Sequence, residues 1–261
     1  MENESLTNLD TKIIGRKVLY FKMATSTNDL AWLEVSRGAT EGTVILAGEQ
    51  LKGRGRFGRT WFAPAGQGIW MSIILKPDLP IEKTSILMIT GAIAACEMLR
   101  EKMNLNAFIR WPNDVMINNK KIAGIILETK YLGHKPEMMV LGIGLNVNLK
   151  QNEIPSDLKD VTTSVAIEKN QEVDQESLTS DLLTYLDNWY YKIRIQDYEA
   201  VTAAWRKMCA LTGKQVIVKT KERQFEGEVV GLDPVKGISL KQSGKIVKLL
   251  RSEDVEMIRL K

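Results

Sequence analysis

The sequence has 261 residues, a mass of 29.4 kDa and a formal net charge of +4. Its hydrophobic share of 44%, its charged share of 26% and its 7 prolines are typical of a globular protein and exclude a disordered or collagen-like chain. The excess charge belongs to residues 213–261, where 11 Lys and Arg outnumber 7 Asp and Glu, which raises the question of an acidic partner for that segment.

The first predicted unit is a strand, a helix cap and a short helix. Residues 16–22 alternate between polar and apolar side chains, as a half-buried strand does. The run Ser26-Thr27-Asn28-Asp29 supplies N-cap residues for a helix that ends near Gly38. Residues 50–68, dense in Gly and Arg, are predicted to be a loop. Further strands are predicted at residues 43–49, 69–76, 107–110, 115–117, 121–131 and 138–148.

Apolar residues at three- and four-residue steps predict three longer helices. The first would cover one side of the sheet, because its apolar residues share a face. The stretch over residues 150–175, which is polar and charged apart from residues 161–167, is the predicted surface connection. The predicted helices span residues 81–102, about 176–193 and about 198–209.

The end of the chain has the pattern of a small β-barrel. Short strands separated by turn residues are predicted at 215–219, 224–232, 237–241, 245–250 and 255–260. The chain as a whole is therefore predicted to be an α+β protein in which a mixed β-sheet carries packed helices. Its expected parts are a tail at residues 1–10, a catalytic domain at 11–211 and a small β-barrel domain at 212–261.

A basic, glycine-rich segment is the first candidate for function. Residues 52–59, Lys-Gly-Arg-Gly-Arg-Phe-Gly-Arg, hold four cations and no acid. Glycines let backbone amides approach an anion, and guanidinium groups bind oxyanions through two hydrogen bonds. The glycines fit G-x-G-x-x-G, but a dinucleotide site requires that a helix follow, and here another strand does. The segment is predicted to hold an anionic ligand.

Two further motifs carry chemistry. Trp111-Pro112-Asn113-Asp114 follows a predicted strand, and an amide and a carboxylate there suit a ribose hydroxyl or a metal-bridged phosphate. Taken alone, the motif is better explained as an Asx turn. Lys121 enters a strand whose neighbours are small or apolar. On its own it could simply extend to solvent.

Other classes of chemistry are disfavoured. Two cysteines cannot build a disulfide framework, and the single histidine, His134, lies in a predicted turn, which excludes a multi-histidine zinc site. Residues 1–10 lack a basic segment followed by an apolar run, so we expect no signal peptide and a cytoplasmic protein. No apolar run reaches the length that a bilayer needs, so no membrane partner is expected.

Taken together, these motifs resemble those of the biotin protein ligases. The pair GRGRFGRTW and WPND carries the resemblance, supported by Ser26-Thr27-Asn28, KIAG at residue 121 and GIGLN at residue 142. The resemblance implies a catalytic fold related to class II aminoacyl-tRNA synthetases and an SH3-like C-terminal barrel. It also implies a reaction in which biotin and ATP, with Mg²⁺, form biotinyl-5′-adenylate, which then acylates a lysine of a biotin carboxyl carrier protein or domain.

The resemblance also implies which residues act. Arg54, Arg56 and Lys121 are implied to be catalytic. Asp114 is our candidate to orient magnesium-bound triphosphate or the lysine. Because a mixed anhydride hydrolyses if water reaches it, the basic loop is also predicted to close as a lid over the adenylate. Implied biotin-binding residues are Ser26, Thr27, Asn28, Gln50, Gly53, Arg54, Gly55, Arg56, Lys121 and Gly124. Implied ATP-binding residues are Arg56, Trp61, Asn113, Lys121 and Asn146.

Alternatives remain open at this stage. A transcriptional regulator with a winged-helix domain is not expected, because only ten residues precede Thr11, so no DNA partner is expected either. RNA binding by the basic C-terminal strands would lack aromatic residues for base stacking, since Phe225 is the only one there. A lipoate ligase, which adenylates a carboxylate in the same way, is the alternative enzyme. Phe57 stands where some biotin ligases have a basic residue, and a homodimer is possible.

Overall fold

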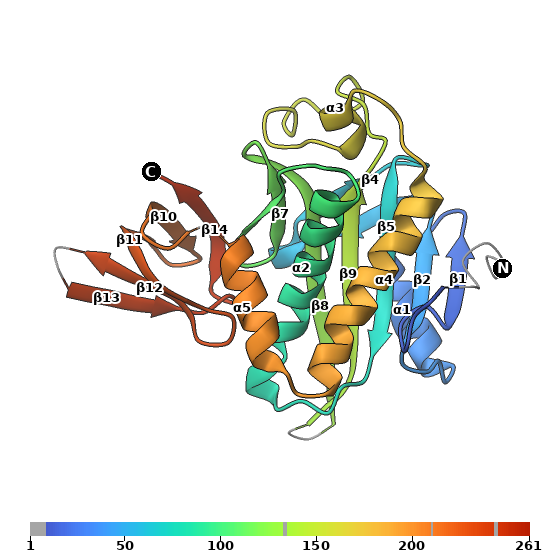
Figure 1. Cartoon of the computed structure of the whole chain (residues 1–261), viewed down its shortest axis with the longest axis horizontal. Helices are drawn as coiled ribbons and strands as arrows, with labels where there is room; N and C mark the ends of the chain where they lie inside the picture. The colour runs from blue at the N-terminus through green and yellow to red at the C-terminus, as the bar shows by residue number, and fades with distance from the viewer. Residues whose placement is uncertain (1–8, 133–134, 210, 243–244) are drawn as a thin grey trace.

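The computed structural model describes residues 9–132, 135–209, 211–242 and 245–261 (Figure 1). The predicted turn at His134 lies outside the described residues. None of the helices in the described ranges is long and apolar enough to cross a membrane.

A seven-stranded mixed sheet forms the centre of the molecule, in the order β1-β2-β5-β9-β8-β7-β6. β1 and β2 are parallel, and the other neighbours are antiparallel. β5 is buried along its whole length, which explains its almost continuous apolar sequence. The strands are β1 (Lys17–Phe21), β2 (Thr43–Ala47), β5 (Gly68–Leu75), β6 (Phe108–Arg110), β7 (Asp114–Ile117), β8 (Lys120–Leu132) and β9 (Lys135–Asn146).

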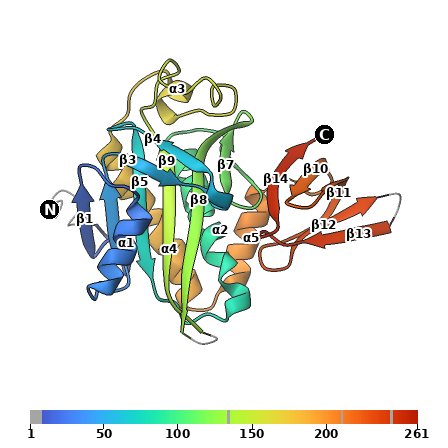
Figure 2. The same cartoon turned by 180° about the vertical axis from the view of Figure 1, so that it is seen from behind.

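Helices cover the two faces of this sheet unequally. α2 (Ser85–Glu101), α4 (Gln175–Arg194) and α5 (Tyr198–Met208) lie on the face turned to the viewer in Figure 1. Seen from behind, α1 (Thr27–Ser36) lies on the other face (Figure 2). Residues 81–83 form a separate 3-10 turn, η3 (Ile81–Lys83), so the predicted helix 81–102 begins at Ser85.

The prediction that residues 50–68 form a loop was wrong in part. Its two halves pair as an antiparallel hairpin, β3 (Gln50–Arg54) and β4 (Thr60–Ala63), joined through the 3-10 turn η2 (Arg56–Gly58). β3 is short and contains Lys and Gly, residues that give little strand signal. The hairpin crosses the open side of the main sheet beside α1 (Figure 2).

The remaining elements complete the chain. The predicted surface connection after β9 holds one short helix, α3 (Val165–Lys169), which Ser164 caps. The C-terminal residues form a separate antiparallel sheet in the order β13-β12-β11-β10-β14, and no pairing closes β13 onto β14 within the described residues. Its strands are β10 (Gln215–Thr220), β11 (Gln224–Asp233), β12 (Gly237–Gln242), β13 (Lys245–Leu250) and β14 (Val255–Leu260). The predicted α+β class, with a mixed sheet carrying helices and an all-β end, is confirmed.

Candidate active site

A pocket lies between the open face of the main sheet, the β3–β4 hairpin and β14. Its lining brings together segments that are far apart in the chain, including the N-cap of α1, the basic loop, the WPND motif and Lys121. Most of the side chains predicted to act therefore line one pocket. Residues Val255 to Ile258 of β14 also line it, and no motif had singled these residues out.

Glycines of β8 and β9 make room for the pocket. Gly124 and Gly144 are paired across the two strands, and the Trp61 ring lies against both. A Cβ atom on Gly144 would lie 2.6 Å from Trp61 Nε1, and one on Gly124 would lie 2.9 Å from Trp61 Cζ3. Two residues before Gly144 in β9, a Cβ atom on Gly142 would lie 2.5 Å from Asn28 Oδ1. Larger side chains at these three positions would fill the floor of the pocket.

The end of the pocket near α1 is a buried hydrogen-bonding group. Ser26 caps α1 by accepting the Asn28 N–H at 3.3 Å. Gln50 Oε1 accepts the backbone N–H of Thr27 at 2.8 Å, and its contact with the Thr27 hydroxyl is 3.1 Å. Ser72 of β5 lies beneath both Thr27 and Asn28. Asn28 Nδ2 is buried and has no hydrogen-bond partner among the residues that the structure describes.

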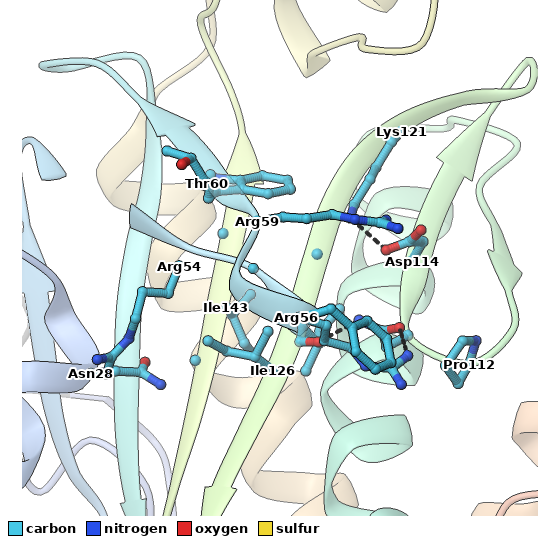
Figure 3. Close-up of a pocket in the computed structure, with 18 of the residues that line it drawn as sticks. Asn28, Arg54, Arg56, Arg59, Thr60, Pro112, Asp114, Lys121, Ile126 and Ile143 are labelled. Carbon is cyan, nitrogen blue, oxygen red and sulfur yellow. Dashed lines mark hydrogen bonds and ion pairs between the residues drawn. The ribbon is translucent and has the colours of Figure 1, made fainter. Parts of the chain in front are cut away.

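Arg54 stands at the same end and is held by two carboxylates. Its guanidinium is 2.6 Å from Asp29 Oδ1 and 3.0 Å from Glu128 Oε1, and Figure 3 shows it beside Asn28. Trp32 Nε1 donates to the other oxygen of Glu128 at 2.7 Å. The Arg54 charge is therefore neutralised in this arrangement and has to leave these partners before it can bind a ligand anion.

Arg56 lies in the turn of the hairpin, η2. Its Nη1 donates to Asn113 Oδ1 at 3.0 Å, and its Nη2 donates to the Ser252 carbonyl. Burial lowers the pKa of Arg56, against the opposing pull of Asp114. Asn113 is in turn fixed, because its Nδ2 donates to the Ile125 carbonyl at 2.6 Å. The basic loop thus contacts both the main sheet and the C-terminal strands, where Arg59 donates to the Glu256 carbonyl at 3.1 Å.

Lys121 and Asp114 form an ion pair at the far end of the pocket from Arg54 (Figure 3). Lys121 Nζ is 2.5 Å from Asp114 Oδ1 and lies 5.0 Å from the centre of the Trp61 ring. Arg110 binds the other Asp114 oxygen at 2.7 Å. Burial alone would raise the pKa of Asp114, but the charges of Lys121 and Arg110 outweigh it and hold that pKa below its usual value.

This geometry does not fit Asp114 as a direct magnesium ligand. Both of its carboxylate oxygens are occupied by cationic side chains. The described ranges also contain no group of three His, Cys, Asp or Glu residues placed to hold a metal ion. Magnesium commonly keeps several waters and is held largely by substrate phosphates, so this site needs no protein cage for it.

Two predicted site residues lie apart from the others. Gly53 and Asn146 are described residues that do not line the pocket. Asn146 is buried and its Nδ2 donates to the Thr163 carbonyl at 2.9 Å. Gly53 packs against the Trp61 backbone, where a Cβ atom would lie 2.5 Å from the Trp61 carbonyl oxygen.

Sequence reasoning missed Arg110 and Ser72. Arg110 is the last residue of β6, four positions before Asp114, a spacing that offered a signal. Ser72 interrupts the apolar run of β5, and a polar residue inside a buried strand is itself a signal of a specific partner.

Comparisons with known proteins agree with this geometry. Residues 20–146 match the model of the biotin/lipoate A/B protein ligase family. The bifunctional ligase/repressor BirA of Bacillus subtilis is 30% identical over 256 residues, which cover 98% of this chain and 78% of BirA. The biotin–[acetyl-CoA-carboxylase] ligase of Paracoccus denitrificans is 30% identical over 213 residues, covering 80% of this chain and 87% of that protein.

A solved structure shares the fold. The biotin protein ligase from Aquifex aeolicus, solved in complex with biotin and ATP, superposes with a TM-score of 0.80 at 24% identity, covering 94% of this chain and 99% of that one. With the fold, the pocket and the relatives in agreement, this chain belongs to the biotin protein ligases of the biotin/lipoate A/B protein ligase family.

Proposed function

We propose that this protein activates biotin with ATP and transfers the biotinyl group to a lysine of a carboxylase carrier domain. In the first step a carboxylate oxygen of biotin attacks the α-phosphorus of ATP, and pyrophosphate leaves. In the second, the lysine amine attacks the carbonyl carbon of biotinyl-5′-adenylate, AMP leaves and the amine loses a proton. The product is an amide.

One observation carries this proposal: a single pocket joins a buried hydrogen-bonding end to a cationic end. The polar end, at Thr27, Asn28 and Gln50, suits the ureido ring of biotin, which both donates and accepts hydrogen bonds. The cationic side chains Arg56 and Lys121 suit the two anions that must meet. Two unit charges about 4 Å apart repel by about 4 kcal/mol at an effective dielectric near 20, so cations have to be in place first.

We assign the other lining residues by the same reasoning. The biotin end of the pocket is lined by Ser26, Gly55 and Gly124, and the nucleotide end is lined by Trp61 and Asn113. Arg54 contacts the biotin carboxylate after its ion pairs with Asp29 and Glu128 break. Gly53 and Asn146 support the site from behind it. Magnesium, bound by the triphosphate, supplies charge neutralisation. The carrier domain approaches the open side, where the basic loop acts as a lid against water.

The direct test is incubation with ATP, magnesium and biotin, followed by mass spectrometry for the adenylate and for a biotinylated carrier domain. Lipoate in a parallel reaction separates the two ligase classes. We expect biotinyl-5′-adenylate and no lipoyl-adenylate. A protein that adenylated lipoate in preference to biotin would refute the proposal.

Two substitutions test the cations. Lys121→Ala should lower pyrophosphate release severely, because the charge beside the reacting groups is lost, and a near-normal rate would contradict its assignment. Arg56→Gly removes the loop's contacts to Asn113 and Ser252. It should let the adenylate escape and label bystander lysines, whereas modification of the carrier alone would contradict the lid.

A further inference from the structure

Two carboxylates outside the pocket hold Arg54, whose side chain lines it. Asp29 Oδ1 lies 2.6 Å from Arg54 Nη1, and Glu128 Oε1 lies 3.0 Å from Arg54 Nη2. Asp29 is in the first turn of α1 and Glu128 is in β8, and neither residue lines the pocket. In Figure 3 Arg54 extends beside Asn28, away from Lys121. Both Nη groups of Arg54 are therefore engaged by residues outside the pocket lining.

A ligand carboxylate needs these same Nη groups. A guanidinium binds a carboxylate most strongly through two parallel N–H groups, and each such pair includes at least one Nη. Charge acts in the same direction, because the negative charges of Asp29 and Glu128 outnumber the single positive charge of Arg54. A carboxylate that approaches Arg54 is therefore disfavoured until at least one of the two ion pairs breaks.

Both ion pairs are partly exposed to water. The exposed fractions of the side chains are 39% for Arg54, 47% for Asp29 and 31% for Glu128. Trp32 Nε1 donates to Glu128 Oε2 at 2.7 Å, which fixes that carboxylate. Ion pairs exposed to this degree shift an equilibrium by no more than about fivefold, because water screens the charges. A ligand can therefore break them, and its affinity falls measurably in doing so.

We propose that Asp29 and Glu128 are positioning residues that lower the affinity of the pocket for carboxylate ligands by holding Arg54 away from them. This inference rests on the proposed function, in which that carboxylate is the one that biotin brings to ATP. A ligand without a carboxylate leaves both ion pairs intact, so its affinity does not depend on them. Removing either negative charge therefore strengthens the binding of biotin but not of a neutral analogue.

The first test compares biotin with biotinol, in which a neutral hydroxymethyl group replaces the carboxylate. Isothermal titration calorimetry on the full chain without ATP measures both affinities. In Asp29→Asn the amide keeps the size of the side chain but loses its charge, so the Kd for biotin should fall about two- to fivefold. The Kd for biotinol should not change. An unchanged or higher Kd for biotin, or an equal change for biotinol, would overturn the proposal.

A comparison of double variants shows whether the effect passes through Arg54. If Asp29 acts only by holding Arg54, Asp29→Asn should have no effect on biotin binding in a chain that already carries Arg54→Gln. A gain in affinity that persists in that background would show that Asp29 repels biotin directly, and this result would also contradict the proposal.

Glu128→Gln repeats the test from β8 and keeps it decisive if Asp29→Asn weakens α1. The amide oxygen still accepts the Trp32 N–H, while the charge beside Arg54 is lost. Biotin should again bind about two- to fivefold more tightly, with biotinol unaffected. A Kd for biotin equal to that of the unchanged chain would count against the proposal.

Glu34→Gln is the matched control. It lies on the same helix as Asp29 and breaks a comparable ion pair, with Arg37 at 2.8 Å, and both affinities should stay unchanged. Tighter biotin binding in this control would attribute the gain to net charge and refute the role of Arg54. If the unchanged chain forms no biotinyl-5′-adenylate, the proposed function fails. If it forms the adenylate and Asp29→Asn binds biotin as before, only this inference fails.

Discussion

Neighbouring charged side chains fix the position of the Lys121 ammonium group. Asp114 binds its Nζ at 2.5 Å, and Arg110 holds the other oxygen of the same carboxylate at 2.7 Å. Asp114 is therefore fixed by two cations and in turn fixes the lysine beside the Trp61 ring. An ordered cation loses little entropy when the reacting anions arrive, which is the advantage of a preorganised site.

Replacing Asp114 with Asn tests this role. The amide keeps the shape but loses the charge, so Lys121 becomes mobile and we expect the kcat of pyrophosphate release to fall about 10- to 100-fold. The KM for biotin should change less, because the far end of the pocket is untouched. Steady-state kinetics give both values. Glu172→Gln, which breaks an exposed pair with Lys150, is the control and should leave kcat unaltered.

The same carboxylate predicts a pH dependence of stability. The pKa of Asp114 is lowered in the folded protein, so its ionised form stabilises the fold at any pH above the unfolded value, about 3.9. That contribution is lost as the pH falls through the lowered folded pKa. The difference in unfolding free energy between the unchanged chain and Asp114→Asn should therefore be constant from pH 5 to 8 and shrink below about pH 4. Urea unfolding at several pH values measures it, and a loss centred near pH 6 would contradict the assignment.

At this scale the sequence predicted the members of the site better than their partners. The basic loop and WPND are local motifs, so their residues were identified without a fold. Arg54, by contrast, pairs with Asp29 on α1 and with Glu128 on β8, two elements that only the folded sheet brings together. Neither ion pair leaves any signal in the spacing of the residues.

Among the elements, β9 contributes residues both to the pocket and to the hydrophobic core. Gly142 and Gly144 face the pocket, while Ile143 and Leu145 belong to the hydrophobic core. This alternation follows from the period of a strand and was visible as GIGLN in the sequence. The β3–β4 hairpin was not visible, because its pairing has a register shift and glycine within it.

α4 holds the start of the chain through one carboxylate. Asp187 is 2% exposed and accepts the backbone N–H groups of Lys12, Ile13 and Ile14 at 2.6 to 2.8 Å. Sequence analysis assigned this residue only to a helix. The contact joins positions about 175 residues apart, which local patterns do not report.

Removing this carboxylate should destabilise the fold. Asp187→Ala leaves three N–H groups without their acceptor, and we expect a loss of about 2–4 kcal/mol in unfolding free energy, measured by urea denaturation. Asp181→Asn on the same helix breaks a partly exposed pair with Lys102 and should cost less than about 1 kcal/mol. Equal effects of the two variants would show that the three hydrogen bonds contribute little.

At the scale of the whole molecule, the C-terminal strands share one hydrophobic core with the main sheet. A single cluster of buried residues runs from β5 and α2 through Trp205 and Met208 into Val216 and Ile258. Polar contacts cross the same boundary, since Arg56 and Arg59 donate to carbonyls of Ser252 and Glu256. Residues 212–261, which the sequence predicted as a separate domain, are thus expected to unfold together with the rest.

The two cysteines report on this cooperativity. Cys96 lies in α2 and Cys209 at the end of α5, next to the C-terminal strands, and both are buried. Burial raises the pKa of Cys96 to about 11 and that of Cys209 to about 12. At pH 8 neither thiol should react with a disulfide reagent until the chain opens, because the thiolate is scarce and shielded.

Single-thiol variants, Cys96→Ala and Cys209→Ala, allow each site to be followed alone across a urea series. If the core is continuous, both thiols should become reactive at the same urea concentration, and that midpoint should coincide with the loss of tryptophan fluorescence. Cys209 becoming reactive at lower urea than Cys96 would show instead that the C-terminal strands separate first. The lid would then lose the carbonyls that hold Arg56 and Arg59 before the main sheet unfolds, and adenylate retention should fail at that same lower concentration.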